Sequence, residues 1–565
     1  MSHLGEPDLP PPTGRDDASP LYRRVGSRMG SPVGSPKRLW GILAVLVLLA
    51  GGGYAGYRLL ADEETDPRVT AAEERFDRFL RAWQAEKPER AASYTDSPER
   101  AESLLDSVMT NLGPSRTRLT AEDGGTKGDG EVGIPFTASM RIPGAGTYEW
   151  RSEARMRERS GTWTVAFRSA AVHPELRDGQ TLALSDRATR GKILDREGDP
   201  LEAASLTGSV DEKSGKGASG LEARYDDRLS GGKGPHKAVV VADRNSGKAV
   251  RTLSKVRRAK GKPVRTTVDP RVQRAAADAL GKVKKNASIV AVDPRNGHIL
   301  AAANKPGGMN RALEGRYPPG STFKVVTTAA LLEKGLKPSD PASCPKFAHV
   351  DGQRFENQGR FTLPKGSTFE DAFAESCNTF FVGARDRLSD SALRDTARAF
   401  GIGGHWDVGA TTYDGKVPVN NGANDKAAAV IGQARVQASP LVMASLAATV
   451  KKGTFTQPVL VPDEVDERYR APAKLSPKVA SDLRELMRTT VTSGSGHALK
   501  GLPGAPHAKT GTAEFGTDDP PRTHAWMIGY QGDDDLAWAV LLEDGGSGGS
   551  DAGPVAARFL KNLAR

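Results

Sequence analysis

The sequence predicts a multidomain α+β protein with a single N-terminal membrane-spanning helix. Three observations lead to this fold class. Residues 39–57 form an uncharged and mostly apolar run, residues 66–176 combine a helical pattern with alternating strand patterns, and a hairpin pattern at residues 288–304 opens a region that runs to residue 565. Because a chain of 565 residues exceeds the usual size of one domain, we expect it to divide into two to four domains.

Charge and cysteine content narrow the classes of function. Lys and Arg total 80 against 69 Asp and Glu, so the formal net charge is +11. A basic balance of this kind fits a nucleic-acid, anionic-lipid or anionic-polymer partner, and charge alone does not choose among them. The only cysteines are Cys344 and Cys377, a number that excludes a disulfide framework and a cysteine-cluster zinc site.

Residues 39–60 are the predicted membrane-spanning helix. As a helix, the uncharged run would cover roughly 28 Å, about the thickness of one bilayer core. A secretory signal peptide, the alternative, usually starts near the first residue, whereas 38 residues precede this run. The tail 1–38 carries six basic and four acidic residues, so the positive-inside rule predicts that it lies in the cytoplasm of a single-pass plasma-membrane protein. Its Pro, Gly and Ser content predicts that it is disordered. The rest of the chain would then lie outside the cytoplasm, which excludes nucleic acid as a partner.

Residues 66–176 are expected to form a small α+β domain. Residues 68–87 repeat apolar side chains at helical spacing, and residues 134–142, 150–156 and 163–167 alternate with the period of half-buried strands. No catalytic cluster appears there, and His173 at its edge is interpreted as a surface residue. Residues 177–285 are Gly-rich and less regular. The seven basic residues within 251–265 indicate a solvated face or, alternatively, contact with anionic envelope polymer or lipid head groups.

A candidate nucleophile lies at the start of a predicted helix. The Pro-Pro-Gly run at 318–320 interrupts any preceding structure, and Ser321 then occupies the expected N-cap of a helix that continues through Leu332. Lys324 shares a helical face with Ser321, so its neutral amine could take the serine proton. By itself this Ser-x-x-Lys spacing is weak evidence, because it is common by chance.

Two further clusters strengthen this interpretation. Ser376 and Asn378 place a hydroxyl and an amide two residues apart, and Lys509, Thr510 and Gly511 follow on a predicted strand. A lysine at position 509 would supply a point charge for a carboxylate and would lower the pKa of a neighbouring lysine. A glycine at position 511 would let a substrate backbone approach the strand edge closely. In this order, Ser-x-x-Lys, Ser-x-Asn and Lys-Thr-Gly are highly specific together.

The three motifs resemble the signature of penicillin-recognising serine enzymes. Other segments extend the resemblance to class B penicillin-binding proteins, which are peptidoglycan D,D-transpeptidases; these segments are residues 267–270, 432–434, 438–441, 190–198 and 217–225. Residues 66–176 are similar to the NTF2-like N-terminal domain of MecA-type proteins. The resemblance implies a short pedestal or dimerisation-like region at 177–285. It also implies a penicillin-binding transpeptidase domain at 286–565, with an antiparallel sheet flanked by helices as in serine β-lactamases.

The resemblance also implies a role for each motif residue. Ser321 would be the acylated nucleophile and Lys324 its general base, while Ser376 and Asn378 would shuttle protons and hold the substrate amide. Residues 509–512 would bind the substrate carboxylate and strand, with catalytic Lys509 and substrate-binding Thr510, Gly511 and Thr512. The backbone N–H groups of residues 321 and 512 would form the oxyanion hole.

The implied reaction needs neither a metal nor an organic cofactor. A peptidoglycan stem peptide ending in D-Ala-D-Ala would acylate the serine and release D-Ala, and an amine of a neighbouring stem peptide would then attack the acyl-enzyme. β-Lactam antibiotics would acylate the same serine and inhibit it covalently. Other wall-synthesis proteins are the further partners that the resemblance implies.

Several alternatives to a monofunctional transpeptidase are consistent with part of the sequence. A D,D-carboxypeptidase would differ only in using water as acceptor, and a catalytically idle β-lactam-binding scaffold or sensor would be expected to lose a motif or to carry a cytoplasmic effector. A bifunctional enzyme would need a glycosyltransferase domain, and a β-lactamase of one class would need a Glu-x-x-Leu-Asn segment; neither pattern appears in the sequence. Cys377 is interpreted as a packing residue rather than a second nucleophile.

Overall fold

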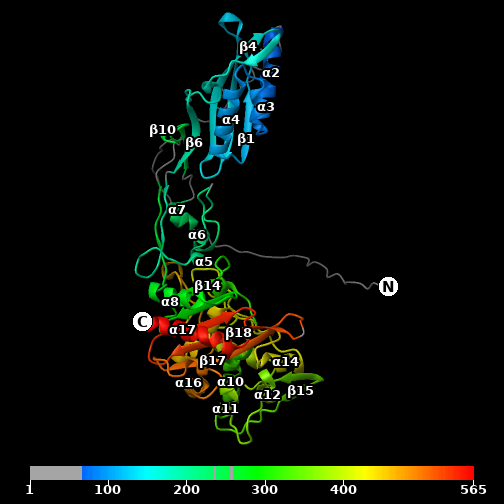
Figure 1. The fold of residues 1–565 in the computed structure, drawn as a ribbon, viewed down its shortest axis with the longest axis vertical. Coiled ribbons are helices and arrows are strands. Elements are labelled where there is room, and N and C mark those ends of the chain that lie inside the picture. The colour runs from blue at the N-terminus through cyan, green and yellow to red at the C-terminus, as the bar shows by residue number, and fades with distance from the viewer. Residues whose placement is uncertain (1–65, 187, 213, 233–236, 255–258, 519) are drawn as a thin grey trace, which may run out of the picture. The chain divides into compact units, whose positions relative to one another are not determined.

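The computed structural model describes residues 66–565 except residues 187, 213, 233–236, 255–258 and 519. Its first region packs helices against an antiparallel sheet in the order β1-β3-β4-β5, with β2 paired to β3 (Figure 1). The elements are α2 (Pro67–Gln84), α3 (Pro88–Ala92), α4 (Pro98–Leu112), β1 (Arg116–Ala121), β2 (Gly125–Thr126), β3 (Val132–Ile142), β4 (Gly146–Arg159) and β5 (Thr162–Val165). The helical face and the three alternating patterns read from the sequence are confirmed.

Aromatic side chains join the first helix of this region to its sheet. Phe76 and Trp83 of α2 contact Phe136 of β3 at ring-centroid distances of 5.6 and 6.3 Å. All three side chains are fully buried, and each such burial stabilises the fold by roughly 1.5–3 kcal/mol.

The interpretation of His173 as a surface residue is wrong. This side chain is 2% exposed, because it packs against the rings of Tyr148 and Trp150. Its Nδ1 accepts a hydrogen bond from the backbone N–H of Glu175, so its Nε2 carries the proton that it shares with Tyr148 at 2.9 Å. Burial lowers the pKa of His173 to about 4.

Residues 180–265 contain more regular structure than their Gly-rich sequence suggested. A three-stranded antiparallel sheet has the order β10-β9-β6, and two short parallel pairs join β11 to β7 and β12 to β8. The strands are β6 (Gln180–Asp186), β7 (Ala188–Thr189), β8 (Ile193–Leu194), β9 (Lys237–Asp243), β10 (Ala249–Thr252), β11 (Ala259–Lys260) and β12 (Val264–Arg265). Within the basic segment, Arg251 forms an ion pair with Glu175, as expected of a solvated face.

The C-terminal region is built on a five-stranded antiparallel sheet in the order β14-β13-β19-β18-β17. Its strands are β13 (Ala287–Val292), β14 (Ile299–Lys305), β17 (Pro506–Phe515), β18 (Arg522–Gln531) and β19 (Ala537–Leu542). The hairpin predicted at 288–304 is β13–β14, and the Lys-Thr-Gly segment lies on β17, at the edge of the sheet. The edge position leaves one side of β17 without a neighbouring strand.

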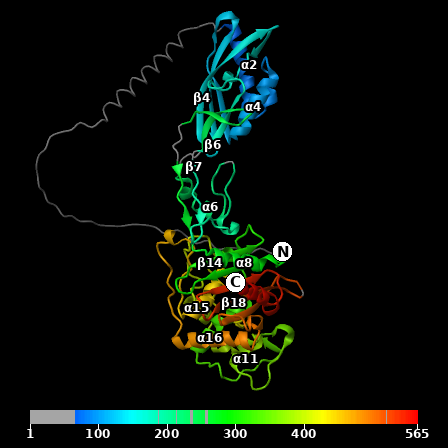
Figure 2. The ribbon, with the colours of Figure 1, turned by 60° about the vertical axis from the view of Figure 1, so that its left-hand side comes forward.

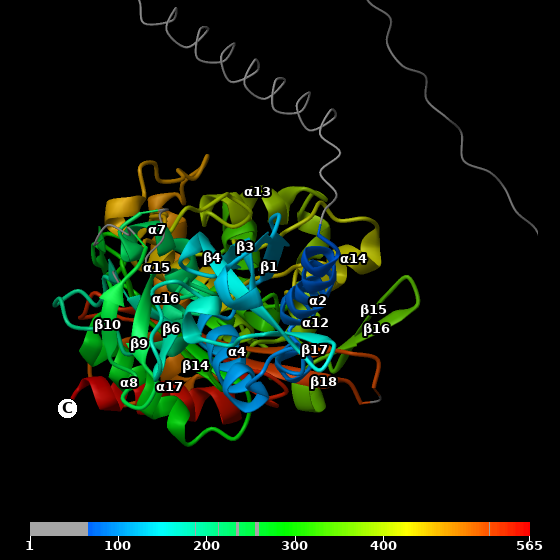
Figure 3. The same cartoon turned by 90° about the horizontal axis from the view of Figure 1, so that it is seen from above.

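Helices cover both faces of this sheet, which explains the continuous apolar runs in its central strands. One face packs on α8 (Pro270–Gly281) and α17 (Gly553–Leu563), and the other packs on α10 (Lys324–Glu333) and α15 (Pro440–Lys452). In Figure 3, α8 and α17 lie on one side of β14 and α15 on the other. Figure 2 shows α15 beside β18, and α16 (Pro477–Thr492) packs against β17. The strand β17, which carries the third motif, also packs against the segment before α10, which carries the first motif. The helix α11 (Phe369–Ala374), which precedes the second motif, packs against α16 as well.

One part of the predicted fold class needs correction. Among the helices of the described residues, none is both long enough and apolar enough to cross a membrane. The longest candidate, α2, has 18 residues but carries several charged side chains. The predicted span 39–60 and the tail 1–38 lie outside the described residues.

Candidate active site

Backbone hydrogen bonds to residues 432–438 hold the segment that carries Ser321. Gly320–Phe323 form a 3-10 turn, η3, that runs directly into α10. Ser321 therefore lies inside this turn and not at an N-cap. Tyr317 bridges to Ala438, and the Gly320 N–H donates to the Gly432 carbonyl at 2.9 Å. Ser321 is 9% exposed and Lys324 is fully buried.

Glycines let three chain segments approach one another around this turn. Gly320 has φ +53° and Gly432 has φ +73°, and a Cβ built on either would lie 2.4 Å or less from a backbone oxygen of Thr512 or Gly320. A Cβ on Gly511 would lie 2.7 Å from Cγ2 of Thr322. The close approach expected at Gly511 is thus made by the nucleophile segment itself.

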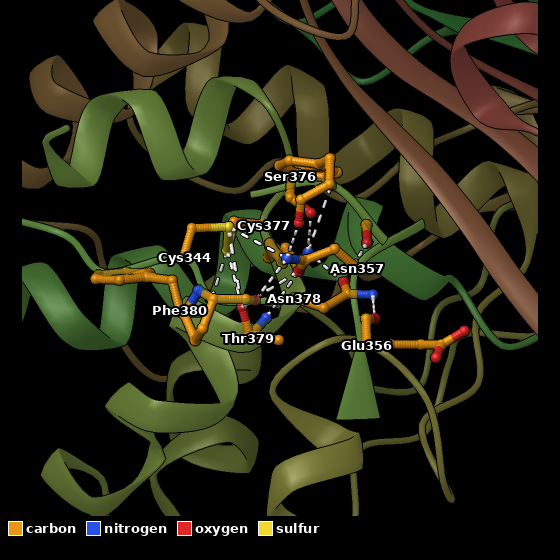
Figure 4. Close-up of a disulfide and its surroundings, with 12 residues drawn as sticks. Cys344, Glu356, Asn357, Ser376, Cys377, Asn378, Thr379 and Phe380 are labelled. Carbon is orange, nitrogen blue, oxygen red and sulfur yellow. Dashed lines mark hydrogen bonds between the residues drawn. A yellow bond between two sulfur atoms is a disulfide. The ribbon is translucent and has the colours of Figure 1, made fainter. Parts of the chain in front are cut away.

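The Ser-x-Asn motif lies in a tight bend between α11 (Phe369–Ala374) and α12 (Asn378–Ala384). Ser376 adopts the left-handed conformation with φ +63°, which costs a residue with a Cβ about 1–2 kcal/mol. Its neighbour Cys377 forms a disulfide with Cys344, with the two Cα atoms 6.1 Å apart (Figure 4). The interpretation of Cys377 as a packing residue is corrected by this bond. An even pair of cysteines in a chain predicted to lie outside the cytoplasm was the available signal.

A polar network beside the disulfide sets the orientation of Asn378 (Figure 4). The Asn378 side-chain amide donates to the Glu356 carbonyl at 2.9 Å, so its Oδ1 faces the active site. Asn357 accepts from the Thr379 N–H at 3.1 Å and donates to the Phe361 carbonyl at 2.8 Å. Glu356 ends a hairpin made of β15 (Phe347–Val350) and β16 (Gln353–Glu356), and residues 357–358 follow it. Sequence reasoning missed this contribution.

The five predicted catalytic side chains lie within one hydrogen-bonded cluster. Lys324 Nζ donates to Asn378 Oδ1 at 2.6 Å and to the Ser376 carbonyl at 2.8 Å. The Ser321 hydroxyl donates to the same Asn378 oxygen at 3.4 Å. The Ser376 hydroxyl lies 2.8 Å from Lys509 Nζ and 3.4 Å from Lys324 Nζ. Asn378 Oδ1 therefore links the serine to Lys324, and the Ser376 hydroxyl links the two lysines.

Burial lowers the pKa of both lysines. The pKa of Lys324 lies well below its ordinary value. Burial is the largest cause, and the charge of Lys509 is the second. Burial likewise lowers the pKa of Lys509 to about 7, against a smaller opposing effect of Glu375. Within the described residues neither lysine has a carboxylate ion-pair partner, and no group of three or more His, Cys, Asp or Glu side chains could hold a metal ion.

The edge strand β17 presents its polar groups to three different loops. The Thr510 hydroxyl lies 2.7 Å from the Ser495 hydroxyl, and the Thr512 hydroxyl donates to Gln358 Oε1 at 3.0 Å. The side-chain amide of Gln433 pairs with the backbone N–H and C=O of Glu514, at 2.7 and 3.2 Å in the orientation that matches donors to acceptors. Backbone N–H and C=O groups alternate between the two sides of a strand. Those of residue 512 therefore point to the same unpaired side of β17 as those of Glu514. Sequence reasoning did not assign Ser495 or Gln358, and no motif marked them.

A serine beside two buried lysines at a sheet edge is the arrangement of the penicillin-recognising class. Family models match the penicillin-binding protein transpeptidase domain over residues 287–562 and the NTF2-like N-terminal transpeptidase domain over residues 71–180. The chain belongs to the penicillin-binding protein family of peptidoglycan D,D-transpeptidases. The family resemblance read from the motifs, including its NTF2-like part, is confirmed.

The similar proteins include two mycobacterial relatives. The peptidoglycan D,D-transpeptidase PbpA of Mycolicibacterium smegmatis is 35% identical over 364 residues, which cover 52% of this chain and 71% of the relative. PbpA of Mycobacterium tuberculosis is 34% identical over 363 residues, with the same coverage. The solved acyl-enzyme complex of M. tuberculosis penicillin-binding protein A with ceftriaxone has a TM-score of 0.56 at 28% identity, covering 66% of this chain and 98% of that one. The corresponding penicillin G complex has a TM-score of 0.55 at 26% identity, covering 67% and 100%.

Proposed function

We propose that this protein cross-links peptidoglycan stem peptides through an acyl-enzyme on Ser321, and that β-lactams inhibit it by acylating the same residue. The observation that carries the proposal is the convergence of Ser321, Lys324, Ser376, Asn378 and Lys509 in one hydrogen-bonded cluster. The names of the mycobacterial relatives and the β-lactam acyl-enzyme structures support the same activity.

Acylation uses the neutral amine of Lys324 as general base. Lys324 takes the Ser321 proton while Oγ attacks the carbonyl carbon of the penultimate D-Ala. The C–O bond forms as the peptide C–N bond breaks, and the departing D-Ala amine receives a proton through the Ser376 hydroxyl. The lowered pKa of Lys324 supports this role, because a lysine of ordinary pKa would be protonated at neutral pH.

Substrate binding uses the edge of β17. Lys509 supplies positive charge for the terminal carboxylate of the donor peptide, and the hydroxyls of Thr510 and Thr512 are the neighbouring donors. Gly511 leaves room for the nucleophile segment, and the N–H groups of Ser321 and Thr512 serve as the oxyanion hole. In the second half of the reaction an acceptor amine attacks the ester carbon, and the serine oxygen regains its proton.

The proposal includes the organisation and location of the chain. We place an NTF2-like domain at 66–176, a short pedestal at 177–285 and the transpeptidase domain at 286–565, in keeping with the matches at 71–180 and 287–562. An NTF2-like domain ahead of the transpeptidase domain supports a monofunctional enzyme. A disulfide beside the catalytic cluster fits an oxidising compartment outside the cytoplasm. We expect other wall-synthesis proteins to be further partners of this chain.

Labelling with a fluorescent penicillin tests the nucleophile. We expect one adduct per chain, located by peptide mass spectrometry on the fragment that contains Ser321, and no adduct on Ser321→Ala. The exposed Ser493→Ala is the matched control and should label like the wild type. Covalent labelling of Ser321→Ala would refute the assignment.

A polymer assay separates the transpeptidase from the D,D-carboxypeptidase. The protein is incubated with lipid-linked pentapeptide polymer, and cross-linked dimers are scored against free tetrapeptides. We expect dimers. Tetrapeptides alone would identify a carboxypeptidase, and neither product together with stoichiometric penicillin labelling would identify an idle scaffold.

A further inference from the structure

Gln358 lies beside the catalytic cluster, on a loop that several hydrogen bonds hold in place. Its side chain is exposed, but the preceding Asn357 is 1% exposed and hydrogen-bonds to Thr379 and to the carbonyls of Pro345 and Phe361. The loop is tied to the second motif as well, because the Glu356 carbonyl accepts from the Asn378 amide. The position of Gln358 is therefore set by the same contacts that orient the catalytic asparagine.

The contact of Gln358 falls on the third motif. The Thr512 hydroxyl donates to Gln358 Oε1 at 3.0 Å and accepts from the Gly548 N–H at 3.3 Å. A hydroxyl has one hydrogen to donate, so the hydrogen of Thr512 is committed to Gln358. Thr512 cannot donate to a substrate carboxylate while that contact is in place.

The other hydroxyl of the motif is less accessible. Thr510 is 5% exposed, and its hydroxyl lies 2.7 Å from that of Ser495, which also donates to the Ala374 carbonyl at 2.9 Å. Thr512 is only half-buried. Thr512 is therefore the more open of the two hydroxyl donors beside Lys509, and the side chain bound to it controls access to that donor.

We propose that Gln358 is a specificity-determining residue that selects donor peptides with a free terminal carboxylate. This inference rests on the proposed function. The donor carboxylate replaces Gln358 Oε1 as the acceptor of the Thr512 hydroxyl hydrogen. The released amide turns and donates an Nε2–H to the carboxylate, so two neutral donors and the Lys509 cation surround the anion. A terminal carboxamide, which carries no charge and brings its own N–H groups, satisfies this set less well.

Substitution by glutamate changes the charge at this position with almost no change in shape. Gln358→Glu keeps an acceptor for Thr512 but removes the N–H donor and places a negative charge where the donor carboxylate must bind. Gln358→Ala removes both the competing acceptor and the added donor. Gln353→Glu is the matched control, because Gln353 is exposed at the other end of β16.

The experiment measures kcat/KM for a donor peptide that ends in a carboxylate and for the same peptide ending in a carboxamide. The ratio of the two values is the readout, since a change in the amount of active enzyme cancels from it. We expect Gln358→Glu to lower the ratio about tenfold or more, Gln358→Ala about threefold, and Gln353→Glu less than twofold, because charge repulsion acts strongly only at close range.

The possible outcomes separate this proposal from the proposed function. An unchanged ratio in Gln358→Glu, with stoichiometric penicillin labelling of Ser321, overturns the role of Gln358. An equal fall in Gln353→Glu would mean that general surface charge is responsible and would also overturn it. Loss of labelling in the wild type would instead contradict the proposed function.

Discussion

Buried charged side chains have different kinds of partner in the N-terminal region 71–180 and in the C-terminal region 287–562. In the first, Glu131 is 7% exposed and contacts the guanidinium groups of Arg155 and Arg157. In the second, Lys324 and Lys509 are fully buried and hydrogen-bond to hydroxyl, amide and carbonyl oxygens. Burial of a charge is costly unless it is paired, so an unpaired buried lysine indicates chemistry where a paired glutamate indicates structure.

Both regions contain non-glycine residues with positive φ, and in residues 71–180 these include Glu86, Asp129 and Ser160. In the C-terminal region Ser376 and Ala434 adopt positive φ, and three glycines permit contacts that no side chain would allow. Ser376 belongs to the second motif, and Ala434 follows Gly432, whose carbonyl accepts from the Gly320 N–H. Two of the positive-φ residues of the C-terminal region thus lie in segments that shape the site, and the predictions below test the difference between the two regions.

The largest effect is expected for Lys324→Met. Loss of the general base should lower the rate of Ser321 acylation by about 10³-fold or more, measured by stopped-flow or gel-based penicillin labelling. Thermal stability should be equal or higher, because methionine avoids the cost of burying an amine. The exposed Lys561→Met is the control; a labelling rate like the wild type's would remove Lys324 from the mechanism.

Removal of the disulfide is the next largest change. A bridge that closes a loop with a sequence separation of 33 residues stabilises a fold by about 3–4 kcal/mol in the chain-entropy account. Cys344→Ser/Cys377→Ser should therefore lower the denaturant midpoint of the C-terminal region, and a reducing agent should do the same to the wild type. A wild-type midpoint insensitive to reduction would contradict the bond.

The pH dependence of kcat/KM tests the charge of Lys509. Its pKa is lowered to about 7, so the ammonium that attracts the donor carboxylate is lost as the pH rises through that value. We expect kcat/KM for a carboxylate donor to fall above pH 7, approaching about tenfold per pH unit, because kcat/KM reports the free enzyme. The matching carboxamide donor should lack this limb, and an identical limb for both donors would rule out the carboxylate contact.

Glu131→Gln probes the paired charge of the N-terminal region. The hydrogen bond from Arg157 is the largest cause of the lowered pKa of Glu131, so the carboxylate stabilises the fold at neutral pH. Because both arginines are partly exposed, we expect a loss of only about 1 kcal/mol in the free energy of unfolding. The difference should vanish as the pH falls through the lowered pKa, and penicillin labelling should stay at the wild-type rate.

Ala434→Gly should have the smallest effect. Ala434 has φ +57°, a conformation that glycine adopts without steric cost, although glycine also gains entropy in the unfolded state. We expect a net stabilisation of about 0.5 kcal/mol, measured by chemical denaturation. Ala428→Gly, on the helix α14 (Ala423–Ala429), should instead be destabilising; equal effects of the two changes would argue against strain at residue 434.

The sequence predicted which residues of the C-terminal region lie together, but not the contacts that join them. Ser321, Lys324, Ser376, Asn378 and Lys509 were identified from motif order, because each motif is a short run of reactive residue types. Their meeting through Asn378 Oδ1 was not predicted, since the Asn378 orientation depends on a carbonyl 22 residues away in the chain. The contact between Ser495 and Thr510 was missed for the same reason.

The sequence by itself determined the family, the candidate site residues and the alternating strands, because these depend on local spacing and on side-chain chemistry. Only the tertiary structure decided that Cys344 bonds to Cys377, that His173 is buried and that Gln358 lies against Thr512. It also decided the pKa of each catalytic lysine, since burial by elements far apart in the sequence is the largest cause of both shifts. Burial and long-range contact arise from how segments pack, and no local pattern carries that information.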